Sequence, residues 1–158
     1  MRRIIQHDKS VVNKGQHVRI YLMASYHRHP EMQAVAQRLM SLGHTVTSRW
    51  IWGGHQASKE AIGTGTLSEF ERRCAEEDMA DLYAAEICIG FSEPWPIIPI
   101  SGGRHPRGGR HVELGMALAW QKEIIVVGRA EHVFHALLQV QYVPDHEGLY
   151  ALLAGGKP

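Results

Sequence analysis

Apolar residues follow two alternating patterns along the chain from residue 18 onward. Short apolar runs bounded by polar or glycine residues predict buried strands, and apolar residues spaced three and four apart predict helices. The predicted strands are residues 18–24, 44–50, 86–91, 123–127 and 139–143. The predicted helices are residues 31–42, 67–83, 111–121, 131–138 and 146–153. Gly43 is expected to end the first helix, because glycine readily adopts the left-handed conformation after a helix.

This alternation of strands and helices predicts an α/β fold, a three-layer sandwich with a mainly parallel sheet of about five strands. Ligands of such folds bind outside the carboxyl ends of the strands. Three polar or glycine-rich segments are expected to leave that edge: residues 25–30, 50–65 and 92–109. The ligand site is therefore expected there.

The bulk composition fits one compact domain over residues 17–158, preceded by a polar extension over residues 1–16. The formal net charge of +1 argues against a partner that is a nucleic-acid polymer or an acidic membrane. Only two cysteines are present and no apolar run reaches transmembrane length, so neither a disulfide framework nor a membrane span is expected. The expected location is the cytoplasm.

Glu113 is the first candidate for chemistry. It follows Gly108 and Gly109 at the start of an apolar helix, and a carboxylate in the first turn is stabilised in its ionised form by unpaired N–H groups and the helix dipole. Such a carboxylate suits a glycosyl-transferring nucleophile. The alternative is that Glu113 only caps or balances the helix dipole.

Two further carboxylates, Asp78 and Asp81, share a stripe with apolar residues near the end of the predicted helix 67–83. Burial and the helix dipole both penalise a charge there. They are therefore candidates to orient a substrate or donate a proton. The alternative is that both are simply solvated at the end of the helix.

Gly108, Gly109 and Arg110 are candidates for binding an anion, because glycines let the backbone approach an oxyanion and helix N–H groups point at it. A tight turn is the competing interpretation. The chain has neither a Walker A lysine pattern nor G-x-G-x-x-G after the first strand, which argues against nucleoside-triphosphate hydrolysis and the dinucleotide fingerprint.

Histidines number 11, but none of their spacings matches a standard zinc signature, so neither a metal nor another cofactor is expected. His27 lies near the expected site. Trp50 lies at the ligand edge, where it is either a stacking wall for a planar base or a hydrophobic plug.

Several of these segments together resemble the nucleoside 2-deoxyribosyltransferase-like family, which includes 2′-deoxynucleoside 5′-monophosphate N-glycosidases. The resemblance covers roughly residues 18–143, and the most specific match is Gly109-Arg110-His111-Val112-Glu113-Leu114-Gly115-Met116-Ala117. The other matching segments are residues 19–25, 77–82, 86–91 and 122–128.

The resemblance implies a flavodoxin-like fold, a small-molecule nucleoside or nucleotide substrate and a homo-oligomer. Glu113 would be the nucleophile that holds a deoxyribose as a covalent ester, with a second carboxylate at about 5 Å in the retaining arrangement. Asp78 would bind the base or pass it a proton, and Tyr21 would orient Glu113. Ser25 and Gly109 would hold the sugar 5′ end or a 5′-phosphate, which Arg28 and Arg110 could recruit.

Two departures leave transferase and hydrolase activity equally open. The first loop reads Ser25-Tyr26-His27-Arg28 in place of the Gly-Pro of typical transferases. The segment before Glu113 lacks the Ser-x-Gly-x-Gly-x-Glu spacing of the monophosphate hydrolases. The main alternative function is a non-catalytic nucleotide-binding module of the same fold. A phosphoribohydrolase ranks lower, because Gly102-Gly103-Arg104 lacks the threonine of the Pro-Gly-Gly-x-Gly-Thr signature.

Overall fold

The computed structural model describes residues 16–56, 64–94 and 108–154. These residues form a five-stranded, all-parallel sheet in the order β2-β1-β3-β4-β5. The strands are β1 (Arg19–Met23), β2 (Thr45–Val46), β3 (Ile87–Phe91), β4 (Glu123–Val127) and β5 (Val140–Val143). The predicted α/β fold with a mainly parallel sheet is confirmed.

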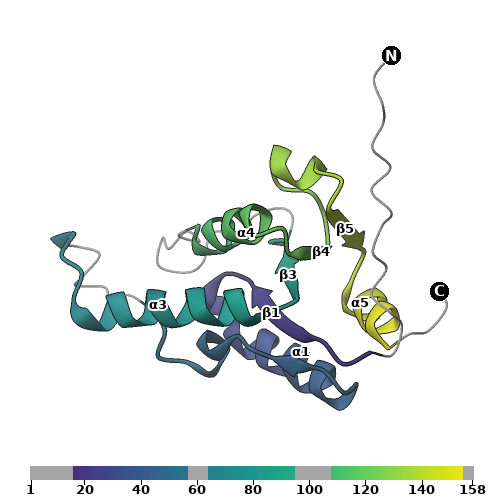
Figure 1. Ribbon diagram of the computed structural model, residues 1–158, viewed down its shortest axis with the longest axis horizontal. Helices are drawn as coiled ribbons and strands as arrows, with labels where there is room; N and C mark the ends of the chain where they lie inside the picture. The colour runs from purple at the N-terminus through teal and green to yellow at the C-terminus, as the bar shows by residue number, and fades with distance from the viewer. Residues whose placement is uncertain (1–15, 57–63, 95–107, 155–158) are drawn as a thin grey trace.

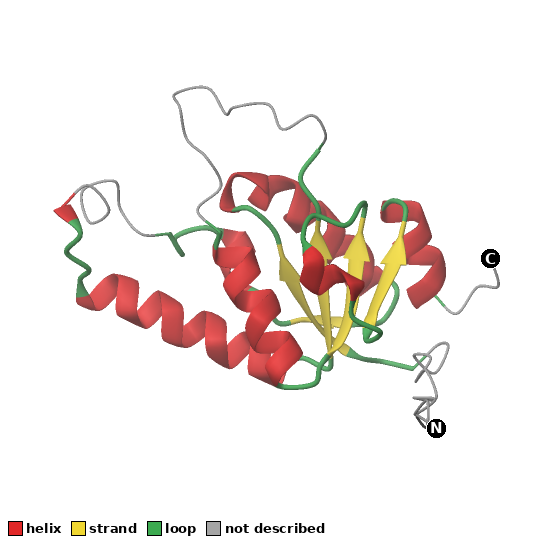
Figure 2. Cartoon of the chain, turned by 90° about the horizontal axis from the view of Figure 1, so that it is seen from above, coloured by secondary structure: helices red, strands yellow, loops and turns green. Residues whose placement is uncertain are grey.

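Helices cover both faces of this sheet, as Figures 1 and 2 show. The helices α1 (His29–Ser41) and α5 (His146–Leu153) pack together on one face, and α3 (Glu69–Ala84) and α4 (Gly109–Ala119) pack together on the other. Three 3-10 helices, Tyr26–Arg28, Arg49–Trp52 and Val133–Ala136, lie in the loops after β1, β2 and β4. The start of α3 projects beyond the sheet (Figure 2).

Continuous apolar runs form the central strands because both of their faces are buried. Ile20, Leu22, Ile89 and Ile124 have no exposed surface. The helices contribute the apolar side chains of their inward faces to the same core, for example Leu39 of α1. The core therefore fixes the strands whose carboxyl ends carry the candidate site.

Local signals in the sequence explain where the helices begin and end. Gly43 ends α1 with φ +91°, and its N–H donates to the carbonyl of Met40 at 3.0 Å, as expected for a terminating glycine. Ser68 and Glu71 form a capping box that begins α3. The five predicted strands and four of the five predicted helices occur close to their predicted positions, and the helix predicted at residues 131–138 is a single 3-10 turn.

The largest error in the prediction concerns residues 44–50. Only Thr45 and Val46 form a strand, and the chain then turns into the 3-10 helix Arg49–Trp52. Trp50 and Ile51 are both buried within this 3-10 helix. The expected N-terminal extension lies almost wholly outside the described residues.

Candidate active site

Tyr21 and Glu113 meet at the centre of the molecule. The Tyr21 hydroxyl donates a 2.8 Å hydrogen bond to Oε1 of Glu113, joining β1 to α4. Tyr21 is fully buried, and burial, followed by the charge of Glu113, raises the pKa of its hydroxyl well above the ordinary value. Tyr21 is therefore a fixed hydrogen-bond donor that orients the carboxyl group of Glu113.

Glu113 does not lie in the first turn of its helix, contrary to the prediction. The helix begins at Gly109 instead of His111, so Glu113 is its fifth residue, beyond the N–H groups that a helix start leaves unpaired. Burial raises its pKa to about 8, the hydrogen bond from Tyr21 lowers it, and the charge of Asp78 raises it. Burial therefore outweighs the expected stabilisation of the ionised form.

Asp78 of α3 lies near enough to this pair for its charge to raise the pKa of both Tyr21 and Glu113. Burial raises its pKa to about 6, with the charge of His55 opposing and that of Asp81 reinforcing the shift. Its Oδ1 is buried and has no hydrogen-bond partner among the described residues. Since buried polar atoms are normally satisfied, this oxygen is available for a ligand.

Asp81 and His55 belong to a group of contacts that holds the loop after β2 against α3. The guanidinium of Arg49 donates to both oxygens of Asp81, from Nη2 to Oδ1 at 2.7 Å and from Nε to Oδ2 at 2.9 Å. The backbone N–H of Arg49 also donates to Oδ2 of Asp81, at 3.0 Å. His55 Nε2 lies 2.7 Å from Oε2 of Glu77. In this structure Asp81 fixes the loop beside Asp78 rather than facing an open site.

Trp50 is only 4 % exposed, and its indole N–H donates to the carbonyl of Leu22 at 2.9 Å. Its ring lies 6.2 Å from that of Tyr26. Of the two interpretations of Trp50, this position fits the hydrophobic plug, because the ring packs into the core beneath β1 instead of forming an open stacking surface.

A second group of charged side chains lies beyond the carboxyl ends of β1 and β3, and we call it the Glu93 cluster. Its members are Ser25, His27, Glu93, Arg110 and Glu131. The Ser25 hydroxyl donates to Oε1 of Glu93, and Arg110 donates to both oxygens of Glu131. His27 Nε2 lies 3.9 Å from Oε2 of Glu93, and Arg110 Nε lies 3.8 Å from Oε1 of Glu93.

Arg28 is held by the protein itself. Its guanidinium donates to both oxygens of Glu31, at 2.7 and 2.8 Å, and to the carbonyl of Ser92 at 2.9 Å. It also lies 5.9 Å from the ring centroid of Phe91. These contacts anchor the loop after β1 to the end of β3.

Gly108 and Gly109 stand at the start of α4, which begins two residues before the predicted start at His111. Gly108 is the N-cap residue with φ +79°, a left-handed conformation that favours glycine, and Gly109 is the first helical residue. An added Cβ would meet no atom of the described residues within 4 Å at either position.

The described residues also form a shallow pocket between β3, β4 and the start of α4. It is lined by Met23, Gly90, Phe91, Ser92, Arg110, His111, Leu114, Val126, Glu131 and His135. Neither Glu113 nor Asp78 is among these residues, so the pocket adjoins the Glu93 cluster and not the Tyr21–Glu113 pair.

The structure thus groups the predicted residues in two places. Tyr21, Asp78 and Glu113 lie together, and Ser25, His27 and Arg110 lie together. Glu93 was missed by the sequence interpretation, although it stands two residues after β3, at the edge where ligands of parallel sheets bind.

Among the described residues, no group of histidine, cysteine and carboxylate side chains could hold a metal ion. None of the helices in the described residues has the length and apolar character needed to span a membrane.

Comparisons with known proteins support this fold. No protein-family model matches the chain, and neither does any curated protein. Among solved structures, a 2-deoxyribosyltransferase from Bacillus psychrosaccharolyticus matches 84 % of this chain and 90 % of its own, with 18 % identity and a TM-score of 0.56. The CMP N-glycosidase BcmB from Clostridium botulinum matches 84 % of this chain and 94 % of its own, with 20 % identity and a TM-score of 0.47.

The first of these likenesses establishes the fold that this chain shares with a 2-deoxyribosyltransferase. The strand order β2-β1-β3-β4-β5 is the flavodoxin-like order, with its switch point between β1 and β3. Tyr21 lies on one of these two strands. The flavodoxin-like fold is the one that the resemblance of the sequence motifs implies.

Proposed function

We propose that this protein is an enzyme that cleaves or transfers the N-glycosidic bond of a 2′-deoxynucleoside or its 5′-monophosphate. The observation that carries the proposal is the Tyr21–Glu113 hydrogen bond at the switch point of the sheet, beside an Asp78 oxygen without a described partner. The names of the two structural neighbours, a deoxyribosyltransferase and an N-glycosidase, point to the same kind of reaction.

In the first step, an ionised Glu113 donates an electron pair to C1′ of the sugar as the bond from C1′ to the base nitrogen breaks. The departing base takes the electron pair of that bond and a proton from Asp78. The product is free base and a deoxyribosyl ester of Glu113. The Tyr21 hydroxyl donates a hydrogen bond to Oε1 of Glu113, and this bond fixes the orientation of the carboxylate that attacks C1′.

In the second step, water or a second base attacks C1′ and restores the Glu113 carboxylate. Asp78, now ionised, takes the proton of the attacking group. Two carboxyl groups with an ester intermediate are the retaining arrangement of glycoside chemistry. Water as the acceptor makes the enzyme a hydrolase, and a base as the acceptor makes it a transferase.

The proposal is tested by incubating the purified protein with a panel of deoxynucleosides and their 5′-monophosphates. Free base is measured with and without an added acceptor base. The expected result is base release from at least one substrate. Tight nucleotide binding with no release over hours would instead identify a non-catalytic binding module, and faster release from ribonucleotides would identify a phosphoribohydrolase.

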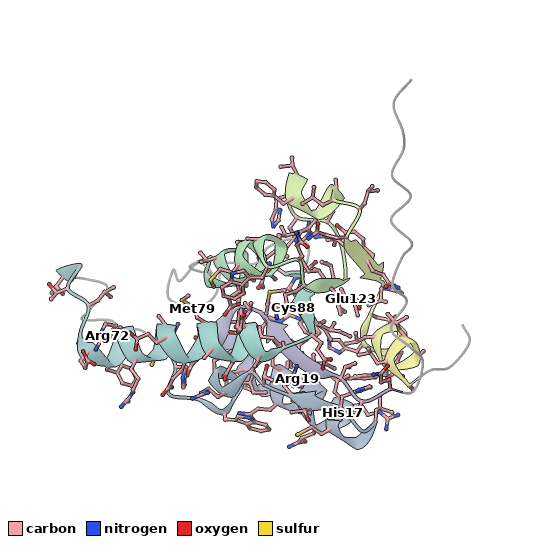
Figure 3. The ribbon with its side chains drawn as sticks, viewed as in Figure 1. His17, Arg19, Arg72, Met79, Cys88 and Glu123 are labelled. Atoms are coloured by element: carbon pink, nitrogen blue, oxygen red, sulfur yellow. The ribbon has the colours of Figure 1, made fainter. Side chains whose placement is uncertain are left out.

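Substitution of Glu113 is the residue-level test. We expect Glu113→Gln to lower kcat/KM at least about 10³-fold, because an amide cannot form the ester. Glu76→Gln is the matched control, since the exposed Glu76 pairs with Arg72, which lies near the projecting end of α3 (Figure 3). Base release by Glu113→Gln at the wild-type rate would remove Glu113 from the mechanism.

The homo-oligomer that the family resemblance implies stays a prediction.

A further inference from the structure

One face of α3 is held against the loop at residues 49–55. The α3 residues on this face lie three or four positions from one another and are Cys74, Glu77, Asp78 and Asp81. His55 Nε2 lies 2.7 Å from Oε2 of Glu77, and the guanidinium of Arg49 donates to both oxygens of Asp81. Asp78 lies between these two contacts, and its buried Oδ1 has no partner among the described residues. The loop therefore forms a wall beside the free oxygen of Asp78.

His55 is the charged group of this wall that acts most strongly on Asp78. Burial is the main cause of the raised pKa of Asp78, and the charge of His55 is the next largest influence and opposes it. The His55 side chain is only 14 % exposed, so little water screens its charge. The other charged or titratable groups of the described residues around Asp78 are Asp81, Arg49, Glu77, Cys74, Tyr21 and Glu113.

Arg49 cannot take the place of His55. It donates three hydrogen bonds to Asp81, two from its guanidinium and one from its backbone, so its charge is engaged by another carboxylate. His55 contacts Glu77 through Nε2, and this nitrogen carries a hydrogen because an ionised carboxylate only accepts hydrogen bonds. Glu77 thus fixes the orientation of the His55 ring beside Asp78.

The proposed first step leaves a negative charge on Asp78. Its proton goes to the base nitrogen as that nitrogen takes the electron pair of the bond to C1′, and Asp78 becomes a carboxylate. Burial penalises this charge, whereas a protonated His55 stabilises it. A group whose ionised form is stabilised gives up its proton more readily, so His55 favours departure of the base. His55 keeps its own proton, and the attacking group returns a proton to Asp78 in the second step.

We propose that His55, oriented by Glu77, is a positioning residue that prepares Asp78 to give its proton to the departing base. The inference rests on the proposed function and adds a residue to its first step. His55 acts through Asp78 and contacts neither the sugar nor the nucleophile.

The variant His55→Gln keeps a hydrogen-bond donor for Glu77 but cannot carry a charge. It is compared with the wild-type protein on deoxynucleosides of one base class whose bases differ in acidity, because an acidic base departs with little need for a proton. We expect kcat/KM to fall about tenfold or more for the least acidic base and less than about threefold for the most acidic one. An equal loss for all bases indicates a structural role and overturns the inference, as does no loss in a folded variant.

Two further variants complete the comparison. His17→Gln is the matched control, because the exposed His17 stands two residues before β1, at the opposite edge of the sheet from the candidate site. It should keep the wild-type rates for every base. Adding His55→Gln to Asp78→Asn should cause no further selective loss, because His55 acts through Asp78. A full, independent loss in the double variant overturns this route of action.

Nuclear magnetic resonance tests the same coupling without turnover. The side-chain carbon of Asp78 should titrate at higher pH in His55→Gln than in the wild-type protein, because the charge of His55 lowers the pKa of Asp78. An unchanged titration in the folded variant overturns the inference.

A reciprocal titration covers the case in which His55→Gln does not fold. The ring of His55 is followed in the wild-type protein and in Asp78→Asn, where it should lose its proton at lower pH, since coupling between two sites is reciprocal. Identical titrations overturn the inference. Coupling without base release from any substrate contradicts the proposed function alone, and base release without coupling contradicts the role of His55 alone.

Discussion

At the residue scale, the pKa values of the two central carboxyl groups, Glu113 and Asp78, have the reverse of the order that their proposed roles require. The pKa of Glu113 is raised to about 8 and that of Asp78 to about 6, in both cases chiefly by burial. At neutral pH the free protein therefore holds Glu113 mostly protonated and Asp78 mostly ionised. The proposed roles need the opposite, an ionised Glu113 and a protonated Asp78, so a minor protonation state carries the reaction.

This order predicts a bell-shaped pH profile of kcat/KM. The rate rises up to pH about 6, because Glu113 ionises further while Asp78 stays protonated. It is level between pH about 6 and 8 and falls above about 8, where Glu113 is ionised and Asp78 keeps losing its proton. Initial rates of base release from pH 5 to 10, at substrate concentrations below KM, measure the two limbs.

Asp78→Asn separates the two groups. We expect this variant to be slower, by about 10²- to 10⁴-fold, because the base leaves without a proton. Its rate should continue to rise above pH 6 and reach a plateau without an alkaline fall, since only Glu113 still titrates. The plateau should begin below pH 8, because the charge of Asp78 raises the pKa of Glu113. An alkaline limb that survives in Asp78→Asn would assign it to another group.

At the element scale, the start of α4 depends on one backbone conformation. Gly108 has φ +79°, whereas Gly109 has helical geometry, and an added Cβ has no described atom within 4 Å at either position. We expect Gly108→Ala to destabilise the protein by about 1–2 kcal/mol through backbone strain alone. Gly109→Ala is the matched control, and it should be neutral or slightly stabilising. Urea denaturation measures both, and equal effects of the two substitutions would contradict this account.

Most elements could be predicted from the sequence because their cause is local. Gly43 and the apolar spacing of residues 31–42 are enough to identify α1. The turn at Arg49–Trp52 was not predictable, because Asp81 of α3 holds the backbone N–H and the guanidinium of Arg49. A contact between residues 32 positions apart leaves no signal in the local pattern.

The same distinction applies to the candidate site. Tyr21, Asp78 and Glu113 could be brought together by fold and resemblance, because each has a characteristic place on a strand or helix. Glu93 was missed although its place two residues after β3 was a signal, because its hydrogen bond with Ser25 is visible only in the folded structure. The pKa of Glu113 was also beyond the sequence interpretation, because it depends on burial beneath other elements and not on its place in the helix.

At the scale of the whole molecule, the desolvated carboxyl group of Glu113 makes stability depend on pH. Its pKa is raised in the folded state from the ordinary 4.5 to about 8, so the folded state holds a proton that the unfolded chain releases in this range. The stability is therefore full below pH about 4.5 and decreases as the pH rises through about 8.

We expect Glu113→Gln to be more stable than the wild-type protein at pH 9, with a difference that shrinks toward pH 5. The reason is that the amide has no charge to bury. Denaturant titrations at a series of pH values measure the difference. A constant gap between the two proteins would show that Glu113 ionises equally in the folded and unfolded states.

The Tyr21–Glu113 hydrogen bond joins residues 92 positions apart. The strand that carries Tyr21 is therefore synthesised long before its partner helix exists, and no shorter nascent chain can assemble the pair. Long-range closures of this kind are slow steps in folding. If the proposed activity holds, base release recovers after dilution from denaturant only when β1, β3 and α4 have docked. The rate of its recovery therefore measures the rate at which these elements dock during refolding.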